Sequence, residues 1–527
     1  MTPARAWGTS NLGASGLLED RAPRLFRRAT CPSEREHLEE MRQQPEVLDH
    51  LSEIDDPEAF CAAVRAGADF IDIRFTDLVG RAHHVTLPAT GFAPPVFRNG
   101  IGFDGSSVPG FKSLEHGDMV LLPEPATAMV DEIGDRVVVS MIAGAAEATT
   151  KRLFPLDPRY IATRAEEVLA SSGHADLSEW SPELEFYLFS SVDYDDAASG
   201  AFYRIGSAEA GWVDPEDPDA ALGYRIQPGS GYHAAPPCDM HFDLRNEMVA
   251  RLVEAGVPVK YHHHENGAPG QVEIELLPEP LVRSSDHLML SKYIIRNTAL
   301  EWGVSATFMP KPLPDEAGSG LHFHIRLERG KRPVLPGEGG YAGLSREGLS
   351  FIGGILSHGR ALSAVTNAST NSYRRLQPGH EAPTNLFFSA GNRSAAIRIP
   401  AYATEPDQLT IEYRPGDATA NPYLAMAALL AAGLDGLEKR IDPRESGYGP
   451  YDENIHDLEN GLRSKIAPLP ISLEEALDDL EREGAFLSES GIFPESFVPT
   501  WVRLKRDEAE SVRLRPHPAE YGLYFDC

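Results

Sequence analysis

Residues 261–276, YHHHENGAPGQVEIEL, carry a dense group of potential metal ligands. Three consecutive histidines precede Glu265, and a Gly/Pro turn follows. Glu273 and Glu275 then lie two residues apart, so that they share one face of a strand. Imidazole ligands would favour a transition metal, whereas carboxylates would favour a hard ion such as Mg²⁺ or Mn²⁺. This stretch alone fits a metal site and a solvated acidic hairpin equally well.

Three other segments repeat the pattern of charged side chains two residues apart on an expected strand. The pairs are Glu183/Glu185, His322/His324 and Glu412/Arg414. Each pair has strongly apolar neighbours, which indicates burial. Buried carboxylates must be paired or bound to a cation, because unshielded like charges draw protons back. The four pairs together therefore favour a site for divalent cations.

A group of arginines accompanies these pairs: Arg374, Arg375, Arg393, Arg398 and Arg414. Guanidinium groups bind carboxylate and phosphate oxygens in a fork. Metal ions held by carboxylates opposite arginines are typical of phosphoryl transfer, where catalysis is mostly positioning and charge neutralisation. The sequence has no GxxxxGK[ST] loop and no protein-kinase motif set. A nucleotide would therefore be held in another way.

The order of the strands and helices that must position these residues predicts an α+β fold, with two sheets formed by different segments. FIDIRFTDLVG and RAHHVTLPA predict a hairpin, and MVLLPEP and RVVVSMI predict two further strands of a small first sheet. The charged pairs fall on strands of the second sheet. Residues 191–236, rich in Asp, Ala, Gly and Pro, are expected to form an extended loop. Helices are predicted over residues 157–170, 241–256, 285–303, 345–365 and 421–440.

Length and composition limit the class of protein. A chain of 527 residues predicts more than one domain. We expect an N-terminal extension, flexible or helical, over residues 1–55, a small domain over 56–150 and a larger one over 151–527. The formal charge of −31 argues against nucleic-acid binding. Four cysteines without CxxC spacing fit a reducing cytoplasm, and no apolar run approaches the length that spans a membrane.

The sequence resembles type I glutamine synthetases over about residues 68–525. The motifs that carry the resemblance include FDGSSVPGF, PELEFYLF, HHHENGAPGQVEIE, GSGLHFHIRL, NSYRRLQPGHEAP, NRSAAIRIP and IEYRPGDATANPYLAMAALLAAGLDG. The resemblance implies a β-grasp domain over 56–150 and a catalytic domain over 151–527, with a curved antiparallel sheet flanked by helices. It also implies a homo-oligomer, a dodecamer of two hexameric rings whose active sites lie between subunits.

The reaction that the resemblance implies joins ammonia to the γ-carboxylate of L-glutamate. ATP forms γ-glutamyl phosphate, and the products are L-glutamine, ADP and phosphate. Two or more Mg²⁺ or Mn²⁺ ions per site are implied as cofactors. Carried onto this chain, one metal ion would bind Glu185, Glu265 and Glu273. The other would bind Glu183, His322 and Glu412.

The resemblance also implies roles for further residues. The substrate glutamate would be held by Arg375, Arg414, Gly318 and Tyr232, and ATP by His263, His324 and Arg398. Arg393 and Arg398 would neutralise the transferring phosphoryl group. Asp104 and Ser107 would form the ammonium site, with Asp104 as a base that reaches a neighbouring subunit. Glu381 would close over the intermediate and take a proton from the amine.

Several positions depart from the family pattern. Ala317 stands where an asparagine usually helps to bind glutamate, and His380 replaces a tyrosine of the flap. Thr410 and Asp407 replace two cations near the nucleotide phosphates, which predicts weaker ATP binding unless Arg326, at a usual serine position, compensates. His456 stands where regulated bacterial relatives carry an adenylylated tyrosine, so we expect no adenylylation there.

Three functions follow from this pattern of matches and departures. Retention of FDGSS and of the metal ligands favours a glutamine synthetase. Ala317 and His380 leave open a γ-glutamyl ligase for a polyamine or another amine. Thr410 and Asp407 support a catalytically weak glutamine-synthetase-like oligomer, but the complete ligand set opposes it, because buried carboxylates without metal are destabilising.

Overall fold

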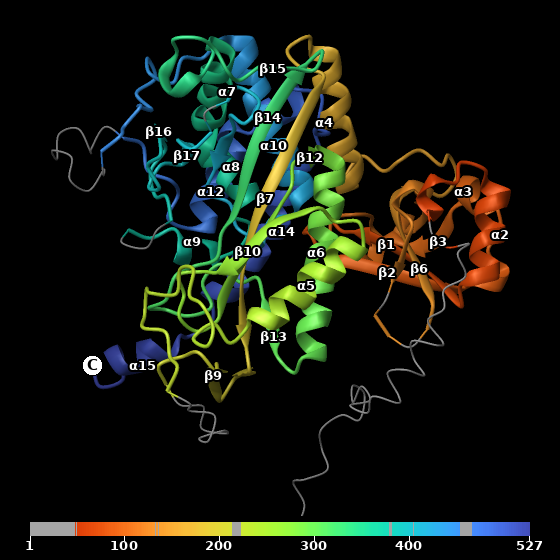
Figure 1. Ribbon diagram of the computed structural model, residues 1–527, viewed down its shortest axis with the longest axis horizontal. Helices are drawn as coiled ribbons and strands as arrows, with labels where there is room; N and C mark the ends of the chain where they lie inside the picture. Colours follow the sequence, from red (N-terminus) through yellow and green to blue (C-terminus); the bar gives the residue numbers. More distant parts are fainter. Residues whose placement is uncertain are drawn as a thin grey trace, which may run out of the picture. The chain divides into compact units, whose positions relative to one another are not determined.

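The structure, a computed structural model, describes residue 48 and residues 50–131, 133–134, 136–212, 223–378, 382–403, 405–453 and 466–527. These residues belong to one compact unit, Glu46–Cys527. Most of the predicted N-terminal extension lies outside the described residues. In the described part, two large sheets, a separate two-stranded hairpin and the packed helices form an α+β fold (Figure 1). The predicted fold class is confirmed.

The first sheet has the strand order β2-β1-β6-β4-β3, and β5 pairs with β6. Its strands are β1 (Phe70–Thr76), β2 (Ala82–Pro88), β3 (Ile101–Asp104), β4 (Asp118–Pro123), β5 (Met129–Asp131) and β6 (Val138–Glu147). The predicted hairpin is confirmed, since β1 and β2 pair antiparallel from Phe70–Pro88 to Thr76–Ala82. Helix α2 (Pro57–Gly67) is capped by the Asp56 carboxylate, which accepts the Ala59 N–H at 2.9 Å. Helix α3 (Pro95–Asn99) precedes β3.

The second sheet is larger and has the order β10-β11-β7-β14-β18-β17-β16. Strands β12 and β13 also pair with β7, and β15 pairs with β14. The long strand β7 is therefore its centre. The strands are β7 (Leu177–Phe189), β10 (Val259–His264), β11 (Gln271–Leu276), β12 (Glu279–Pro280), β13 (Ser305–Thr307), β14 (Leu321–Arg329), β15 (Arg332–Pro333), β16 (Phe388–Ala390), β17 (Ile397–Ile399) and β18 (Ile411–Tyr413).

The helices of the second part pack mainly against one another and against β7 (Figure 1). They are α4 (Pro158–Ser172), α5 (Phe242–Glu254), α6 (Leu281–Glu301), α7 (Arg346–Ser357), α8 (Gly359–Thr366), α9 (Ser372–Arg375), α10 (Pro422–Lys439), α12 (Leu473–Glu483), α13 (Ala485–Glu489), α14 (Phe497–Arg513) and α15 (Pro518–Tyr524). Short 3₁₀ helices lie at Leu51–Glu53, Ala89–Gly91, Gly105–Ser107, Leu114–His116, Pro125–Thr127 and Tyr341–Gly343. Within the described ranges, no helix is long and apolar enough to cross a membrane.

Three predicted elements were wrong in detail. The expected loop over 191–236 begins with a hairpin, β8 (Ser191–Ala197) and β9 (Gly200–Gly206), because its aromatic and β-branched residues favour strands. The helix placed at Ser285 begins at Leu281, so the Ser285 hydroxyl donates to the Leu281 carbonyl inside the helix instead of capping it. The single helix over 345–365 is broken at His358, which bonds Asp435 at 2.9 Å.

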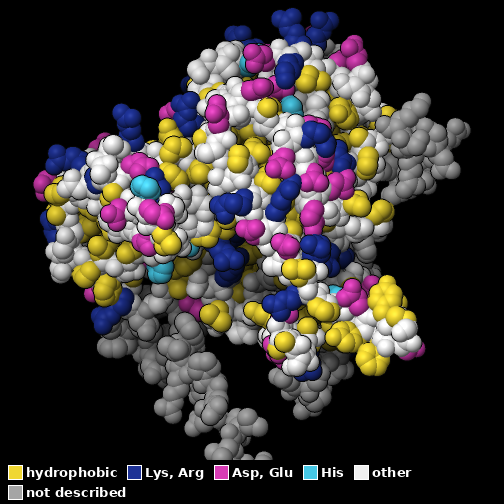
Figure 2. Space-filling model, turned by 180° about the vertical axis from the view of Figure 1, so that it is seen from behind, with side chains coloured by type: hydrophobic (Ala, Val, Ile, Leu, Met, Phe, Trp, Pro, Cys, Tyr) yellow, Lys and Arg dark blue, Asp and Glu magenta, His cyan; other side chains and the backbone are white. Residues whose placement is uncertain are grey.

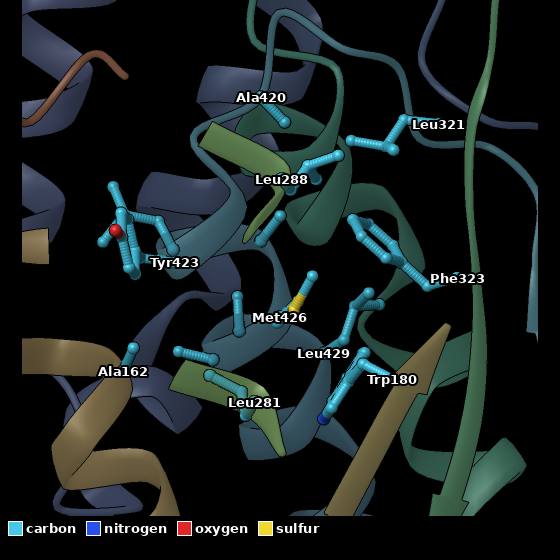
Figure 3. Packing of buried hydrophobic residues seen from close by; sticks show 14 of the residues in the cluster. Ala162, Trp180, Leu281, Leu288, Leu321, Phe323, Ala420, Tyr423, Met426 and Leu429 are labelled. Carbon is cyan, nitrogen blue, oxygen red and sulfur yellow. The ribbon is translucent and has the colours of Figure 1, made fainter. Parts of the chain in front are cut away.

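Helix α10 is the centre of the hydrophobic core. Apolar residues surround it on nearly all sides and almost all of its side chains are buried, as its sequence predicted. Figure 3 shows Met426 and Leu429 of α10 lying among Trp180 and Phe323 of the large sheet and Leu281 of α6. The Asn421 amide at its N-terminus donates to the carbonyls of Asp77 (3.0 Å) and Leu78 (3.3 Å), which attaches the β1–β2 turn.

The surface shows mixed charge and one apolar projection. On the face in Figure 2, acidic and basic side chains are interspersed. Hydrophobic side chains gather on the projection that contains the C-terminal segment (Figure 2), where Tyr521, Leu523, Tyr524 and Phe525 are exposed. Exposed apolar groups of this kind indicate contact with a partner.

Glycines allow α7 and α10 to approach closely, and this contact can be tested. A Cβ at Gly354 would lie 2.0 Å from the Ala432 carbonyl oxygen and 2.7 Å from the Gly436 Cα. We expect Gly354→Ala to lower the free energy of unfolding by about 1–3 kcal/mol through overpacking. Gly522→Ala in α15, where nothing lies within 4 Å, is the control. Alanine stabilises an open helix position, so the control should keep or raise its melting temperature. Equal melting temperatures for the two variants would contradict this packing.

Candidate active site

The four charged pairs of the sequence meet on neighbouring strands. Strands β11, β7, β14 and β18 are consecutive in the large sheet. Glu273 on β11 lies opposite Glu185 on β7, and His322 on β14 lies opposite Glu183. His324 in turn lies opposite Glu412 on β18. Alternation places these side chains on one sheet face, while Leu184 and Phe186 are buried on the other.

These residues line a cavity of about 150 Å³, which we call the carboxylate cavity. Most of the site residues predicted from the sequence are among its lining residues. They are Glu183, Glu185, Tyr232, His263, Glu265, Glu273, Gly318, His322, Arg375, Arg393, Arg398, Glu412 and Arg414. His324 is buried next to this lining, with its Nε2 2.8 Å from Glu183.

One half of the cavity pairs its carboxylates with positive groups. Glu183 lies 2.8 Å from both His322 and His324. Burial alone would raise the pKa of Glu183, but the charge of His324 and hydrogen bonds from both histidines hold it well below its ordinary value. Glu412 accepts hydrogen bonds from Arg398 at 2.6 Å and from Arg414. Although burial opposes it, the Arg414 charge lowers the pKa of Glu412.

In the other half, the pKa values of two carboxylates are raised by burial and by neighbouring carboxylates. Burial and the charges of Glu185 and Glu273 raise the pKa of Glu265 to about 9. Burial and the charges of Glu183 and Glu185 raise the pKa of Glu273 well above its ordinary value. The nearest imidazole there is that of His263, whose Nε2 lies 3.5 Å from Glu273. Among the described residues, this half has less positive than negative charge, and a bound cation would supply the difference.

Ligand atoms come close enough together for metal ions in both halves. Glu183, His324 and Glu412 offer one group of donors within 4.8 Å of one another, and His263, Glu265 and Glu273 offer a second. Carboxylate oxygens with one imidazole nitrogen each fit a hard divalent cation. These groups differ from the predicted sets in one member each: His324 takes the place of His322, and His263 that of Glu185. All four residues stay within the site.

The arginines are held by the backbone and by Glu412. Arg375 donates to the carbonyls of Pro415 (2.8 Å) and Gly416 (3.1 Å) and is almost fully buried. A Cβ at Gly318 would lie 2.7 Å from the Arg375 Cγ, so only glycine fits there. The Arg393 guanidinium lies 5.4 Å from the Tyr232 ring centre, a cation–π distance.

Several predicted residues lie elsewhere or outside the description. Asp104 ends β3, and Ser107 lies in the 3₁₀ turn that follows; neither is among the described residues that line the cavity. Asp104 accepts hydrogen bonds from Ser106 (2.7 and 2.9 Å) and Ser107 (3.0 Å). These bonds lower the pKa of the exposed Asp104 carboxyl. Glu381, His380 and His456 lie outside the described residues.

Two supporting contacts were missed from the sequence. The Gln271 amide donates to Glu185 (3.3 Å) and to the Gly318 carbonyl (3.1 Å). Its place two residues before Glu273 on β11 was the available signal. His264 is fully buried, with Nε2 3.1 Å from Glu209. Glu209 follows the hairpin in the segment predicted as a loop, so no local pattern indicated this contact.

The departures from the family pattern also have defined contacts. The Thr410 hydroxyl lies 3.1 Å from Nδ1 of His324. Arg326 donates to Glu179 at 2.6 Å and to the Asp407 carbonyl at 2.7 Å, whereas its buried Nε has no hydrogen-bond partner among the described residues. Ala317 lines the carboxylate cavity, and its carbonyl accepts the Tyr187 hydroxyl at 2.6 Å.

Comparisons with known proteins agree with this architecture. The model of the glutamine synthetase catalytic domain matches residues 155–524, and that of the glutamine synthetase beta-Grasp domain matches 67–146. Glutamine synthetase of Frankia alni is 43% identical over 459 residues, which cover 87% of this chain and 96% of its own. Glutamine synthetase of Aquifex aeolicus is 44% identical over 462 residues, which cover 88% of this chain and 97% of its own.

Solved structures give the same result for the fold. Plasmodium falciparum glutamine synthetase superposes with a TM-score of 0.81 at 24% identity, covering 89% of this chain and 99% of its own. A GmaS/ADP complex has a TM-score of 0.73 at 26% identity, covering 90% of this chain and 100% of its own. A β-grasp domain followed by this catalytic domain defines an ATP-dependent ligase. The chain belongs to the glutamine synthetase family.

The raised pKa of Glu265 leads to a testable prediction about metal binding. Neutral glutamine at position 265 removes one of the mutually repelling carboxylates, so Glu265→Gln should melt at a higher temperature than wild type in EDTA. In Mn²⁺ the order should reverse, because the variant loses a ligand and binds the ion at least about tenfold more weakly.

Melting curves in EDTA and across a Mn²⁺ titration measure both effects. The exposed Glu495→Gln variant is the control and should follow wild type throughout. A Glu265→Gln protein that is less stable than wild type in EDTA would show that this carboxylate is not repelled in the metal-free fold.

Proposed function

We propose that this protein joins ammonia to the γ-carboxylate of L-glutamate, using ATP to form γ-glutamyl phosphate and releasing L-glutamine, ADP and phosphate. The observation that carries this proposal is the carboxylate cavity. In it, a group of buried carboxylates short of positive charge shares one cavity with four arginines, within a chain of the glutamine synthetase family. This is the arrangement that phosphoryl transfer requires.

Six residues would hold two Mg²⁺ or Mn²⁺ ions: Glu183, Glu185, Glu265, Glu273, His322 and Glu412. His263 and His324 are additional donors within reach. The raised pKa values of Glu265 and Glu273 and the hard oxygen donors support this assignment. Bound there, the ions would screen phosphate charge and polarise phosphoryl oxygens.

The arginines would bind and orient the anionic groups. Arg375 is fixed by two backbone carbonyls and Arg414 by Glu412, so both are preorganised to hold the glutamate carboxylates beside Gly318 and Tyr232. Arg393 and Arg398 would neutralise the transferring phosphoryl group. Nε of Arg398 is buried and has no hydrogen-bond partner among the described residues, which leaves it free to donate to an oxyanion. His263, His324 and Arg398 would contact ATP.

The amine would be handled by Asp104, Ser107 and Glu381. Hydrogen bonds from Ser106 and Ser107 lower the pKa of the Asp104 carboxyl, so the ionised group can attract ammonium. Asp104 would also act as the base that takes the ammonium proton. Because Asp104 lies away from the cavity of its own chain, we propose that it acts on the site of a neighbouring copy. Glu381 would cover the intermediate and take a proton from the amine that attacks it.

The same reasoning extends to assembly, domains and compartment. We propose a dodecamer of two hexameric rings, supported by the exposed aromatic side chains of the C-terminal segment. We also propose a β-grasp domain over residues 56–150, a catalytic domain over 151–527 and an extension over 1–55. The cytoplasm is the proposed compartment, because Cys61, Cys238 and Cys527 are free.

The reaction is tested by measuring phosphate release from ATP, Mg²⁺ and glutamate. We expect turnover that depends on ammonium, with glutamine as the product, and at least about 100-fold lower kcat for Glu412→Gln, which also unpairs two arginines. Ala317 in the cavity makes organic amines the second candidate acceptors. A panel of methylamine, ethanolamine and putrescine therefore accompanies ammonium. Turnover with an amine but not with ammonium would overturn the proposal.

A complementation experiment tests whether the site is shared between copies. Asp104→Asn and Glu412→Gln should each be inactive alone. The two variants are co-expressed with different tags, and assemblies that contain both are purified. Each chain then carries one defect, so a site formed within a single chain stays inactive. A site that takes Asp104 from a neighbour is intact in about one quarter of random pairings. We therefore expect about one quarter of wild-type activity. Activity no higher than that of the separate variants would place Asp104 outside a shared site.

A further inference from the structure

A second cavity, of about 210 Å³, lies between the first sheet and helix α6. We call it the α6 cavity. Its described lining residues differ entirely from those of the carboxylate cavity. The first sheet contributes Phe75 of β1, Met129 of β5 and Ile142 of β6, and α6 contributes Met289 and Leu290. The proposed ligase reaction assigns no role to this space.

The walls of the α6 cavity suit a flat apolar molecule. Met129 and Met289 bring flexible, polarisable thioethers, which make favourable contacts with aromatic rings. Ala128 leaves space, because its side chain is short. A cavity of about 150 Å³ in another protein is large enough to bind benzene, so this one accommodates a substituted ring.

One hydrogen-bonding group in the α6 cavity is left unsatisfied. Ser140 on β6 is 2% exposed, and its hydroxyl oxygen has no hydrogen-bond partner within the described residues. Ser140 lies opposite Asp72 on β1 and Met129 on β5 and lines the cavity. Buried hydroxyls are normally paired, since an unpaired one costs desolvation free energy. Rotation of the Ser140 side chain that turns this hydroxyl toward the cavity would let a ligand with one polar group satisfy it.

The charged residues around the α6 cavity are already neutralised by one another. Arg74 is paired with Asp72 at 2.9 Å and with Asp131. Asp286 accepts hydrogen bonds from Arg159 at 3.0 Å and from the Tyr423 hydroxyl at 2.7 Å.

The remaining charged side chains of the described lining, Arg283 and His287, both pair with Glu279. His287 is 2.5 Å from Glu279, and Glu279 also accepts from Arg283, which is largely exposed. No buried charge in the described lining thus awaits a counter-ion, and an ionised ligand would lose its hydration without compensation.

We propose that the α6 cavity binds a small neutral molecule with one aromatic ring and one hydroxyl or N–H group. The ring lies against Met129, Met289 and Leu290, and the polar group forms a hydrogen bond with the Ser140 hydroxyl. Such a ligand joins the first sheet to α6. The Ser284 hydroxyl of α6 donates to the Trp180 carbonyl on β7, the strand that carries Glu183 and Glu185, so the ligand contacts an element packed on the catalytic strand.

The proposal is tested by calorimetric titration of the full-length protein with phenol, toluene and benzoate. We expect saturable binding of phenol and toluene, and binding of benzoate at least about tenfold weaker than that of phenol. Ser140→Ala should weaken phenol binding about threefold to tenfold and leave toluene unchanged, because only phenol loses a hydrogen bond. Phenol binding should persist in Glu412→Gln, which separates this result from the ligase assay.

Two further variants complete the test. Thr298→Val removes another buried, unpartnered hydroxyl of α6 that does not line the cavity, so it should bind phenol as wild type does. Ala128→Phe should fill the cavity and abolish binding of both phenol and toluene. Unsaturable binding, equal phenol affinity in Ser140→Ala and wild type, or phenol binding retained by a folded Ala128→Phe protein would each overturn the proposal.

Discussion

Mutual repulsion among the buried carboxylates of the large sheet is the constraint on which the rest of the structure depends. Glu265 and Glu273 lie close to Glu185, and burial raises the pKa of Glu265 and of Glu273. Strands β7 and β11 hold Glu185 and Glu273, and Glu265 is fixed just after β10 by its backbone N–H, which donates to the Gln271 carbonyl at 2.8 Å. The opposite sheet face is anchored by Leu184, Phe186 and other buried apolar side chains. Stability gained on the apolar face thus offsets repulsion on the polar one, and a cation completes the balance.

Helix α10 connects this apolar core to both parts of the site. Its buried side chains pack under β7 and β14, and the loop that leads into it supplies the Pro415 and Gly416 carbonyls that hold Arg375. At its N-terminus, Asn421 holds the β1–β2 turn of the first sheet. The same helix therefore sets the arginine position and fixes the small sheet. This arrangement is rigid because glycines let α7 and α10 pack backbone against backbone.

The distribution of charge within the cavity separates two tasks. The half around Glu412 and Glu183 is internally neutralised by arginines and histidines, so its geometry is set before any substrate binds. The half around Glu265 is not neutralised in this way by the described residues. The Thr410 hydroxyl lies 3.1 Å from Nδ1 of His324, and Arg326 is hydrogen-bonded to Glu179.

The sequence by itself determined the charged strands, because strand alternation and apolar neighbours are local signals. Glu183/Glu185, Glu273/Glu275 and His322/His324 could be assigned to one face each, and the buried character of α10 followed from its composition. The motifs from FDGSS to NPYLAMAALLAAGLDG also identified the family, which the comparisons confirm.

Tertiary structure decided which of these residues meet. The strand order β11-β7-β14-β18 brings Glu273, Glu183, His322 and Glu412 to one cavity. Only the packed structure shows that His264 pairs with Glu209. It also placed Asp104 outside the described lining of the cavity of its own chain and left the Ser140 hydroxyl without a partner among the described residues. It began α6 at Leu281 and ended α7 before His358. Local sequence could not show these features, because each depends on atoms brought together from distant parts of the chain.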